Sequence, residues 1–590
     1  MMIDSPDLIL LHAPSVYDFR QKSILYGPVS DVVPSTQIFE MYPIGFMTLL
    51  AHLRQHGYAV RIINVALRML WSRRFDAEKL IRGLQPMAFG LDLHWLVHAH
   101  GSLALAEIIK KYHPAIPVIF GGLSASYYHE ELIRYPYVDY VVRGDSAEEP
   151  LRQLLAAIKE GRRPADVPNL TWKDGGQVHI NERAAPPANL DAIVFDYRTM
   201  MRSTLRYLDL LGHLPFSEWL RYPITCALSC RGCIHHCVTC GGSAFAHNSI
   251  SGRQRPAFRS PEMLAQDVAL AARHIPAPVI VLGDLLQAGA DYAEHFLEAL
   301  KAAKIRNHLA IEFFAPPPRR ILERIAAAIP KFNIQISPES HDEAIRRRFG
   351  RLYDNAALEQ MLADAHEVGC QRLDLFFMIG LPGQTAQSVR DTLAYCRTLL
   401  ERFGRNPSGW LHPYISPLAP FLDPGSLAFE HPEQYGYRLF CRTLEEHRRA
   451  LLAPTWQETL NYETEWLSRR EIAQMTYEAA FELNRLKTEY GLQQQKIGRR
   501  LEQRIATERA VLAKIEEILA TAAEADREAR IAEVLRQFKL VGAATLCHAH
   551  EMKWPVSFLR FNPFRILQGL WARPPKQTGP VSENRSGRHR

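Results

Sequence analysis

Cysteine gives the clearest chemical signal in this chain of 590 residues. Five of its nine cysteines lie between residues 226 and 240, within TCALSCRGCIHHCVTCGGS. They repeat the spacing Cys-x3-Cys-x2-Cys, because Cys226, Cys230 and Cys233 match it and so do Cys233, Cys237 and Cys240. Cysteines clustered in this way point to metal or redox chemistry rather than to disulfides in an intracellular protein.

The spacing narrows the kind of metal site. Zinc ribbons separate two Cys-x2-Cys pairs by roughly 15–20 residues, whereas here only three residues separate Cys233 from Cys237. The ferredoxin run Cys-x2-Cys-x2-Cys-x3-Cys-Pro does not fit either. A loop of three thiolates after the strand-like run RYPITCAL remains, and soft thiolates suit an iron–sulfur cluster.

This pattern resembles the signature of the radical S-adenosylmethionine (SAM) superfamily. The resemblance implies a [4Fe-4S] cluster held by three cysteines, with SAM on the fourth iron and one-electron cleavage to a 5′-deoxyadenosyl radical. Arg231-Gly232-Cys233 is similar to members that bind vitamin B12, in which that cysteine is the first ligand. The resemblance therefore implies Cys233, Cys237 and Cys240 as the metal ligands. Cys226 and Cys230 are expected to be structural, with a redox or second-site role as the alternative.

Further strand-like runs follow the cysteines and alternate with helical patterns, which predicts a full or partial parallel barrel with its site at the carboxyl ends of the strands. The resemblance implies a (β/α)6 partial barrel of the TIM type. Three of these ends match superfamily landmarks for SAM. The resemblance assigns SAM binding to Gly283, Asp284, Glu339, Ser340, Gly380 and Pro382. Thr239 departs from the family, which usually has an aromatic residue before the last ligand.

The sixth predicted strand, within residues 409–420, is rich in aromatic residues. Trp410, His412 and Tyr414 line a pocket if they face the barrel mouth, and then His412 and Tyr414 are candidate catalytic residues. The alternative is that strand alternation buries two of the three in the core.

Residues 1–160 alternate apolar strands with helices, which predicts an α/β, doubly wound, Rossmann-like domain. The order of its motifs resembles the cobalamin-binding domain of B12-type radical SAM enzymes. The implied cobalamin contacts are at strand ends: Gly121, Gly122, Ser124, Arg143 and Gly144. Other methylcobalamin enzymes carry Asp-x-His-x-x-Gly, but Asp92-Leu93-His94 is followed by Val97 at the glycine position. Cobalt is therefore expected to receive no imidazole from this motif.

The rest of the chain divides by composition. A hairpin and linker are expected over 161–205, the barrel over 206–450 and a helical domain over 451–540. A basic, aromatic tail follows over 541–590, with a disordered end. The tail's composition suits a membrane surface, and docking on the protein is the alternative.

Composition limits the location and the kinds of partner that we expect for this protein. Hydrophobic residues make up 47% and charged residues 23%, and the net charge is +7. These values and the absence of a leader or spanning segment predict a cytoplasmic protein, with membrane association through the tail. No nucleic-acid partner is expected, because the basic residues are dispersed.

The leading hypothesis is a B12-dependent radical SAM enzyme that methylates, or forms a carbon–carbon bond at, an unactivated carbon of a hydrophobic, lipid-like or isoprenoid small molecule. It requires an electron donor such as ferredoxin or flavodoxin. Hopanoid methylases, tetraether ring synthases and the anaerobic cyclase of chlorophyll synthesis belong to the class that it resembles. The alternatives are a radical SAM enzyme that modifies RNA or peptide, and a non-catalytic iron–sulfur sensor.

Overall fold

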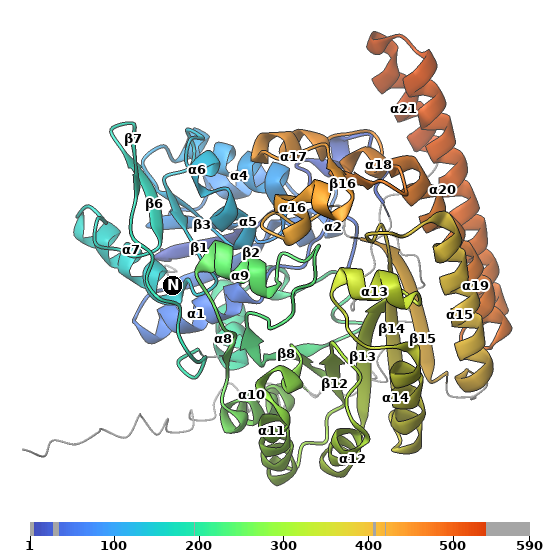
Figure 1. Ribbon diagram of the computed structural model, residues 1–590. Coiled ribbons are helices and arrows are strands. Elements are labelled where there is room, and N and C mark those ends of the chain that lie inside the picture. The colour runs from blue at the N-terminus through green and yellow to red at the C-terminus, as the bar shows by residue number, and fades with distance from the viewer. Residues whose placement is uncertain are drawn as a thin grey trace, which may run out of the picture.

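The computed structural model describes residues 5–27, 35–193, 195–275, 277–404, 409–418 and 421–537. Two sheets with helices around them form most of the molecule, and three long helices extend along one side (Figure 1). The expected α/β architecture is confirmed.

The first sheet has seven strands in the order β2-β1-β3-β4-β5-β6-β7. Its strands are β1 (Leu8–His12), β2 (Val60–Asn64), β3 (Ala88–Asp92), β4 (Val118–Gly121), β5 (Tyr140–Val142), β6 (Leu170–Asp174) and β7 (Gln177–Ile180). The first five run parallel, with Leu8 opposite Val60 on one side and Ala88 on the other. The order 2-1-3-4-5 places a crevice between the carboxyl ends of β1 and β3, where the direction of winding reverses.

Helices cover both faces of this sheet, as its buried parallel strands require. They are α1 (Gly45–Gln55), α2 (Val65–Trp71), α3 (Ala77–Arg82), α4 (Ala99–Tyr112), α5 (Leu123–Tyr127), α6 (His129–Leu132) and α7 (Glu148–Glu160). Leu8 and Leu10 share a core with α1 and α7. Ile9 and Leu11 point the other way, into a core with α3 and α4.

The predicted hairpin is part of the first sheet. Strand β6 pairs antiparallel with β5 and β7 pairs with β6. Gly175 and Gly176 form the turn, and both have positive φ, as a two-residue type I′ turn needs. The segment after it leads to α8 (Tyr197–Tyr207), which packs against α1 and β2.

The second sheet contains six parallel strands in the order β15-β14-β13-β12-β11-β8. They are β8 (Thr225–Leu228), β11 (Val279–Leu282), β12 (Leu309–Phe313), β13 (Phe332–Glu339), β14 (Arg372–Ile379) and β15 (Leu411–Pro417). All six runs predicted as barrel strands are strands, so the partial barrel is confirmed. Its helices are α9 (Ala244–Ser251), α10 (Pro261–His274), α11 (Ala290–Ala303), α12 (Arg319–Ala328), α13 (Glu343–Phe349), α14 (Asn355–Glu367) and α15 (Ala386–Phe403).

The chain after the barrel returns to the first domain. It forms α16 (Leu427–Glu430), β16 (Tyr437–Leu439), α17 (Leu444–Ala450), α18 (Trp456–Thr459) and β17 (Tyr462–Thr464). Helix α17 packs against α4, and Leu25 bridges to Thr455. This segment therefore joins the barrel to the sheet that precedes it.

Three helices follow, α19 (Arg469–Glu489), α20 (Gln495–Thr521) and α21 (Glu524–Gln537). Helix α19 packs against β15 and α15, where it covers the edge of the barrel (Figure 1). In the described part of the chain, no helix is both long and apolar enough to cross a membrane. The predicted basic tail, 541–590, lies outside the described residues.

Candidate functional site

The cysteine loop is fixed at both ends. It leaves β8 through the short strand β9 (Cys230–Arg231), which pairs with β10 (Ala257–Phe258). It ends at α9, where Ser243 caps the helix by accepting from the N–H of Ala246. Within the loop, the N–H of Val238 donates to the carbonyl of Phe349 over 2.9 Å. The loop is thus held at the barrel mouth.

Backbone N–H groups point at two of the loop sulfurs. The N–H of His235 points at Cys233 Sγ over 3.4 Å, and the N–H of Gly242 points at Cys240 Sγ over 3.3 Å. Hydrogen bonds to cluster sulfurs are one of the means by which proteins tune iron–sulfur centres. Burial raises the pKa of the Cys237 thiol to about 11, and nearby Arg351 opposes this shift.

The other two cysteines have different surroundings. Cys226 lies on β8 among apolar side chains, and its sulfur is 3.7 Å from the hydroxyl of Tyr197. Cys230 Sγ lies 3.8 Å from the carbonyl oxygen of Gly232. Cys226 is partly buried on β8, whereas Cys233, Cys237 and Cys240 share the loop after β9, and their assignment as ligands stays a prediction.

The three loop sulfurs suit a cluster better than a single ion. Within the described residues, the one set of three His, Cys, Asp or Glu ligand atoms within 4.8 Å of one another lies elsewhere in the chain. A mononuclear ion needs such close ligands, whereas the irons of a cubane occupy separate corners. The residues present therefore fit a [4Fe-4S] cluster.

A buried arginine that the sequence did not single out serves this site. The guanidinium of Arg351 donates to the carbonyl of Phe314 over 3.1 Å and to Glu339 Oε1 over 3.5 Å. Its charge lowers the pKa values of Cys233 and Cys237, against burial that raises them. Arg351 thus supplies positive charge beside thiolates that would otherwise be buried without compensation.

The predicted SAM residues gather around this loop. Gly283 has a φ of +92°, and a Cβ there would lie 2.7 Å from both Cys230 Sγ and Ser229 Oγ. The carboxylate of Asp284 accepts from the N–H groups of Leu286 and Phe314, each over 2.8 Å. Asp284 therefore organises the turn beyond β11 while Gly283 allows the close approach.

Glu339 and Ser340 end β13 on the same side. Burial raises the pKa of Glu339 to about 7, and Arg351 opposes the shift. Its second oxygen, Oε2, has no hydrogen-bond partner in the described chain, which leaves an acceptor for a ligand amine or hydroxyl. The Ser340 carbonyl accepts from the Arg346 guanidinium, at 3.0 Å from Nε and 2.7 Å from Nη2.

Gly380 and Pro382 form the turn after β14. The N–H of Gly380 donates to Gln384 Oε1 over 2.7 Å, and its carbonyl accepts from the Tyr437 hydroxyl over 2.8 Å. A Cβ at this glycine, whose φ is +101°, would meet the Tyr462 hydroxyl at 2.6 Å. Pro382 is buried beside it.

The candidate catalytic residues of β15, whose orientation the sequence left open, are buried along the strand. His412 is near the amino end of the strand, where its Nε2 lies 2.7 Å from the Gly409 carbonyl. Tyr414 is stacked on Phe376, and its hydroxyl accepts from Arg372 over 2.6 Å. Trp410 donates to the Cys370 carbonyl in the core. Because His412 is the second residue of β15 and Tyr414 is at its middle, neither lies at the carboxyl end of the strand.

The predicted cobalamin residues are only partly together. Gly121 ends β4, and Gly122, with a φ of +116°, lies so close to the His94 backbone that a Cβ would be 2.6 Å away. The Ser124 hydroxyl donates to the His94 carbonyl over 3.1 Å. Gly144 also has positive φ, and its N–H donates to the Ser126 hydroxyl over 2.8 Å. Among the described residues, apart from its chain neighbours, no heavy atom lies within 4 Å of a Cβ built at Gly144, so the backbone is open there.

Arg143 is the exception among them. Its guanidinium donates to the carbonyl of Asn181 in the hairpin, and its own N–H donates to the Asn169 carbonyl. It therefore supports the hairpin rather than the open end of the sheet.

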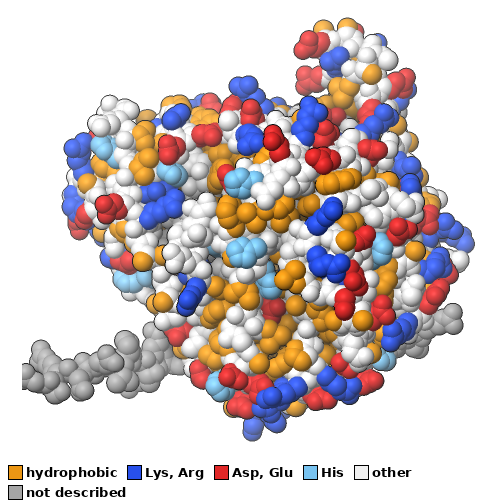
Figure 2. Space-filling model, in the orientation of Figure 1, with side chains coloured by type: hydrophobic (Ala, Val, Ile, Leu, Met, Phe, Trp, Pro, Cys, Tyr) orange, Lys and Arg blue, Asp and Glu red, His pale blue; other side chains and the backbone are white. Residues whose placement is uncertain are grey.

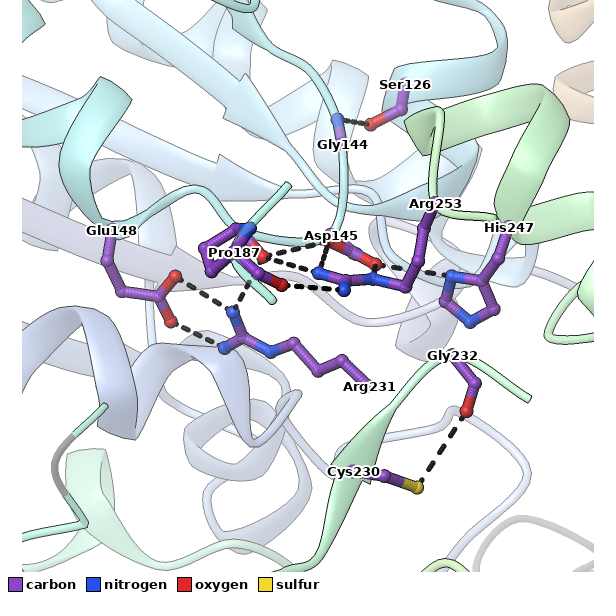
Figure 3. A network of polar contacts seen from close by, with 11 residues as sticks. Ser126, Gly144, Asp145, Glu148, Pro187, Cys230, Arg231, Gly232, His247 and Arg253 are labelled. Carbon is purple, nitrogen blue, oxygen red and sulfur yellow. Dashed lines mark hydrogen bonds and ion pairs between the residues drawn. The ribbon is translucent and has the colours of Figure 1, made fainter. Parts of the chain in front are cut away.

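Two ion pairs link the first domain to the cysteine loop and to the segment after α9 (Figure 3). Arg231, two residues before Cys233, donates to both oxygens of Glu148 at 2.9 and 2.5 Å. Arg253 donates to both oxygens of Asp145 at 2.5 and 3.0 Å, and His247 lies 3.4 Å from the same carboxylate. Asp145 and Glu148 follow β5, so the carboxyl edge of the first sheet faces the mouth of the barrel.

A cavity lies between these two edges. Mostly apolar side chains line it, including Val16 and Val97 after β1 and β3, Leu418 after β15, and Trp456 and Leu460 of the segment after the barrel. This is where a doubly wound sheet binds its ligand, beyond the strand ends at the point where winding reverses. Sequence reasoning missed these residues, because they come from distant segments without a motif.

The segment after the barrel also contacts the cysteine loop. The N–H of Gly241 donates to Asp423 Oδ2 over 2.9 Å, and a Cβ at Gly241 would lie 2.8 Å from the Asp423 Cβ. Burial raises the pKa of Asp423 to about 6. The CGGS and FLDPGS stretches are thus parts of one structure.

A fold with a B12-type sheet facing a cysteine-bearing partial barrel defines a class of two-domain enzyme. Family models place the two parts: residues 33–155 match the B12 binding domain, and residues 228–396 match the radical SAM superfamily. The chain therefore combines a B12 binding domain with a radical SAM domain.

Solved structures share the overall fold. One is the radical S-adenosylmethionine methyltransferase TsrM from Kitasatospora setae with cobalamin and a [4Fe-4S] cluster bound, at 15% identity and a TM-score of 0.56, covering 82% of this chain and 89% of that one. Another is the cobalamin-dependent S-adenosylmethionine radical enzyme OxsB with aqua-cobalamin bound, at 14% identity and a TM-score of 0.51, covering 91% of this chain and 71% of that one. The comparison with curated proteins finds no match.

Proposed function

We propose that this protein is a B12-dependent radical SAM enzyme that transfers a methyl group to, or forms a carbon–carbon bond at, an unactivated carbon of a hydrophobic small molecule. The observation that carries the proposal is that two ion pairs, Arg231 with Glu148 and Arg253 with Asp145, hold the carboxyl edge of the first sheet against the mouth of the barrel that bears the cysteine loop. A mostly apolar cavity lies beyond the ends of β1, β3 and β15. Ligands held on the two edges would then face each other.

Each part of the site has a defined task in this proposal. Cys233, Cys237 and Cys240 would hold the [4Fe-4S] cluster, and Arg351 would balance its charge. Gly283 and Glu339 would receive SAM, while Gly121, Gly122 and Gly144 would approach the corrin. When bound, the cluster supplies the electron that cleaves SAM, and cobalamin supplies the methyl group. The electrons come from a donor such as ferredoxin or flavodoxin.

A hydrophobic substrate is supported by the lining of the cavity and by the outer surface. Figure 2 shows hydrophobic side chains across the middle of the face that carries α9 and α16, with most charged side chains toward its edge. A methyl transfer, rather than another radical reaction, is favoured because the similar TsrM structure is that of a methyltransferase.

The test uses protein purified and reconstituted without oxygen, with hydroxocobalamin supplied. Wild type and the triple variant Cys233→Ala, Cys237→Ala, Cys240→Ala are compared by iron and sulfide content, absorbance and electron paramagnetic resonance. The expected result is that the variant loses the cluster and retains corrinoid. SAM with a reductant should give 5′-deoxyadenosine in the wild type alone.

Each contrary result has a distinct meaning. A cluster that survives in the triple variant moves the ligands to the earlier register. A folded protein without corrinoid makes the first domain a substrate or structural module. A cluster that never cleaves SAM identifies an iron–sulfur sensor instead.

A further inference from the structure

A second set of metal-ligand residues lies in the first domain, away from the cysteine loop. His12 ends β1, Asp92 ends β3, and His98 follows on the turn before α4. One ligand atom from each lies within 4.8 Å of the others, and all three residues are buried. Nothing in the proposed function uses this trio.

The two imidazoles are oriented by backbone carbonyls. His12 Nε2 lies 3.1 Å from the Phe39 carbonyl, and His98 Nδ1 lies 3.0 Å from the Ala13 carbonyl. Because a carbonyl can only accept, each of these nitrogens carries the proton. The opposite nitrogens, His12 Nδ1 and His98 Nε2, are then free to present lone pairs. Histidines that ligate metals are held in this manner, with the second nitrogen donating to a carbonyl or carboxylate.

The carboxylate completes the set. Asp92 Oδ1 lies 2.9 Å from His12 Nδ1. Two ligands about 2.0–2.1 Å from one ion, at a right angle to each other, lie about 2.9 Å apart. Within the described residues, neither Asp92 Oδ2 nor His98 Nε2 has a hydrogen-bond partner, although both are fully enclosed. Orphan polar atoms in a buried site need a ligand to satisfy them.

A competing arrangement is a charged His12 that donates to both Asp92 and Phe39. It would account for the 2.9 Å contact. It would also leave Asp92 Oδ2 and His98 Nε2 unsatisfied in the core, which is costly for groups of this polarity. An ion at the centre engages all three side chains at once.

We infer that His12, Asp92 and His98 form a binding site for a divalent first-row metal ion, such as Zn²⁺ or Fe²⁺. Two histidines and one carboxylate are a ligand set that both ions use. The ion would tie the carboxyl ends of β1 and β3 to the segment around Phe39. Phe39 and Val97 also line the cavity, so the ion would hold two of its lining segments in place.

The first experiment measures zinc, because cluster iron and corrinoid cobalt do not contribute to it. Full-length wild type, Asp92→Asn and His98→Gln are dialysed against dilute zinc with a weak competing chelator, and bound zinc is counted by mass spectrometry. His113→Gln is the matched control, since His113 is also buried and bonds the Ile81 carbonyl outside the trio. We expect wild type and the control to hold one equivalent more than the other two variants. Equal zinc in all four proteins overturns the proposal.

A second measurement does not depend on the folding of the trio variants. Co²⁺ is added to the full-length triple cysteine variant, prepared without corrinoid. A visible band without thiolate charge transfer, displaced by one equivalent of zinc, supports a nitrogen and oxygen site. The absence of any such band contradicts it. Neither measurement requires catalytic activity, so this proposal can fail while the proposed function stands.

Discussion

At the scale of single residues, the site depends on glycines whose role is steric. Gly283 and Gly289 have nearly equal φ values, +92° and +98°, but only Gly283 faces side chains. The sulfur of Cys230 and the hydroxyl of Ser229 occupy the space that a methyl group would need. Strain and crowding therefore add at Gly283, whereas Gly289 shows strain alone.

This difference gives the first prediction. Gly283→Ala should lower the free energy of unfolding by about 2–4 kcal/mol, and Gly289→Ala by about 1–2 kcal/mol. Urea unfolding measures both. SAM affinity should fall in Gly283→Ala and stay near wild type in Gly289→Ala. Equal losses in the two variants would show that crowding by Cys230 has no effect.

Arg351 is the second residue with a defined electrostatic task. Replacement by Gln leaves Glu339 buried without its cation and removes positive charge beside Cys237. We expect Arg351→Gln to destabilise the protein by about 3 kcal/mol and to lower both the iron content and the reduction potential of the cluster. Arg351→Lys should restore part of each.

The control for this change is Arg320→Gln on α12, because the Arg320 side chain is 75% exposed. It should leave iron content and stability unchanged. If Arg351→Gln reconstitutes with full iron and an unchanged potential, the charge at this position does not act on the cluster.

At the scale of elements, β9 and α7 connect the two domains. Arg231 on β9 and Glu148 at the first turn of α7 form a pair whose side chains are only 12% and 10% exposed. Thr48 on α1 donates to the same carboxylate over 2.7 Å. The pair therefore fixes the cysteine loop relative to the edge of the first sheet.

Breaking this pair should separate the two half-reactions. Glu148→Gln and Arg231→Gln should each cost about 2–4 kcal/mol of stability, with strong coupling in the double variant. 5′-Deoxyadenosine should still form while transfer to substrate falls, because the spacing between the two ligands has changed.

The adjacent surface pair, Glu149 with Arg152, is the control, and Arg152→Gln should change stability by less than about 1 kcal/mol. A parallel fall of both products would mean that the pair only supports folding.

Of the three scales, the sequence predicted best the helices and strands themselves. Continuous apolar runs between helical patterns identified the parallel strands of both sheets, since buried parallel strands have that pattern. The hairpin was predicted, but its pairing with β5 was not, because pairing depends on tertiary contacts. The orientation of His412 and Tyr414 was left open by the sequence, because alternation alone does not say which end of a strand a residue is near.

At the scale of the whole molecule, contacts between distant parts of the chain could not be predicted from local sequence. Asp423 meets Gly241 across 182 residues, and His12 meets Asp92 across 80. Arg351 comes just after the arginine-rich end of a helix, and arginines in such positions are ordinarily solvated. Arg351 is nevertheless only 7% exposed. Such contacts arise when two sheets and a returning segment close on one another, and no motif encodes them. The cavity has the same origin, because its lining comes from four separate parts of the chain.

This closure leads to the last prediction. The edge of the first sheet contacts the barrel through Asp145 and Arg253, and the segment after the barrel contacts the cysteine loop through Asp423 and Gly241. A corrinoid bound at that edge should therefore cover the barrel mouth. We expect hydroxocobalamin to slow the loss of cluster absorbance in air severalfold, because oxygen reaches the cluster through that mouth. The comparison uses reconstituted protein with and without corrinoid, at equal iron content.

Arg253→Gln is the informative variant, since it removes the contacts with Asp145 and loosens the interface without touching the cysteines. Corrinoid should protect its cluster less than that of the wild type. If corrinoid binds the wild type but leaves the rate of cluster loss unchanged, the two sites do not share one enclosed space, and methyl transfer between them would require a movement of the domains.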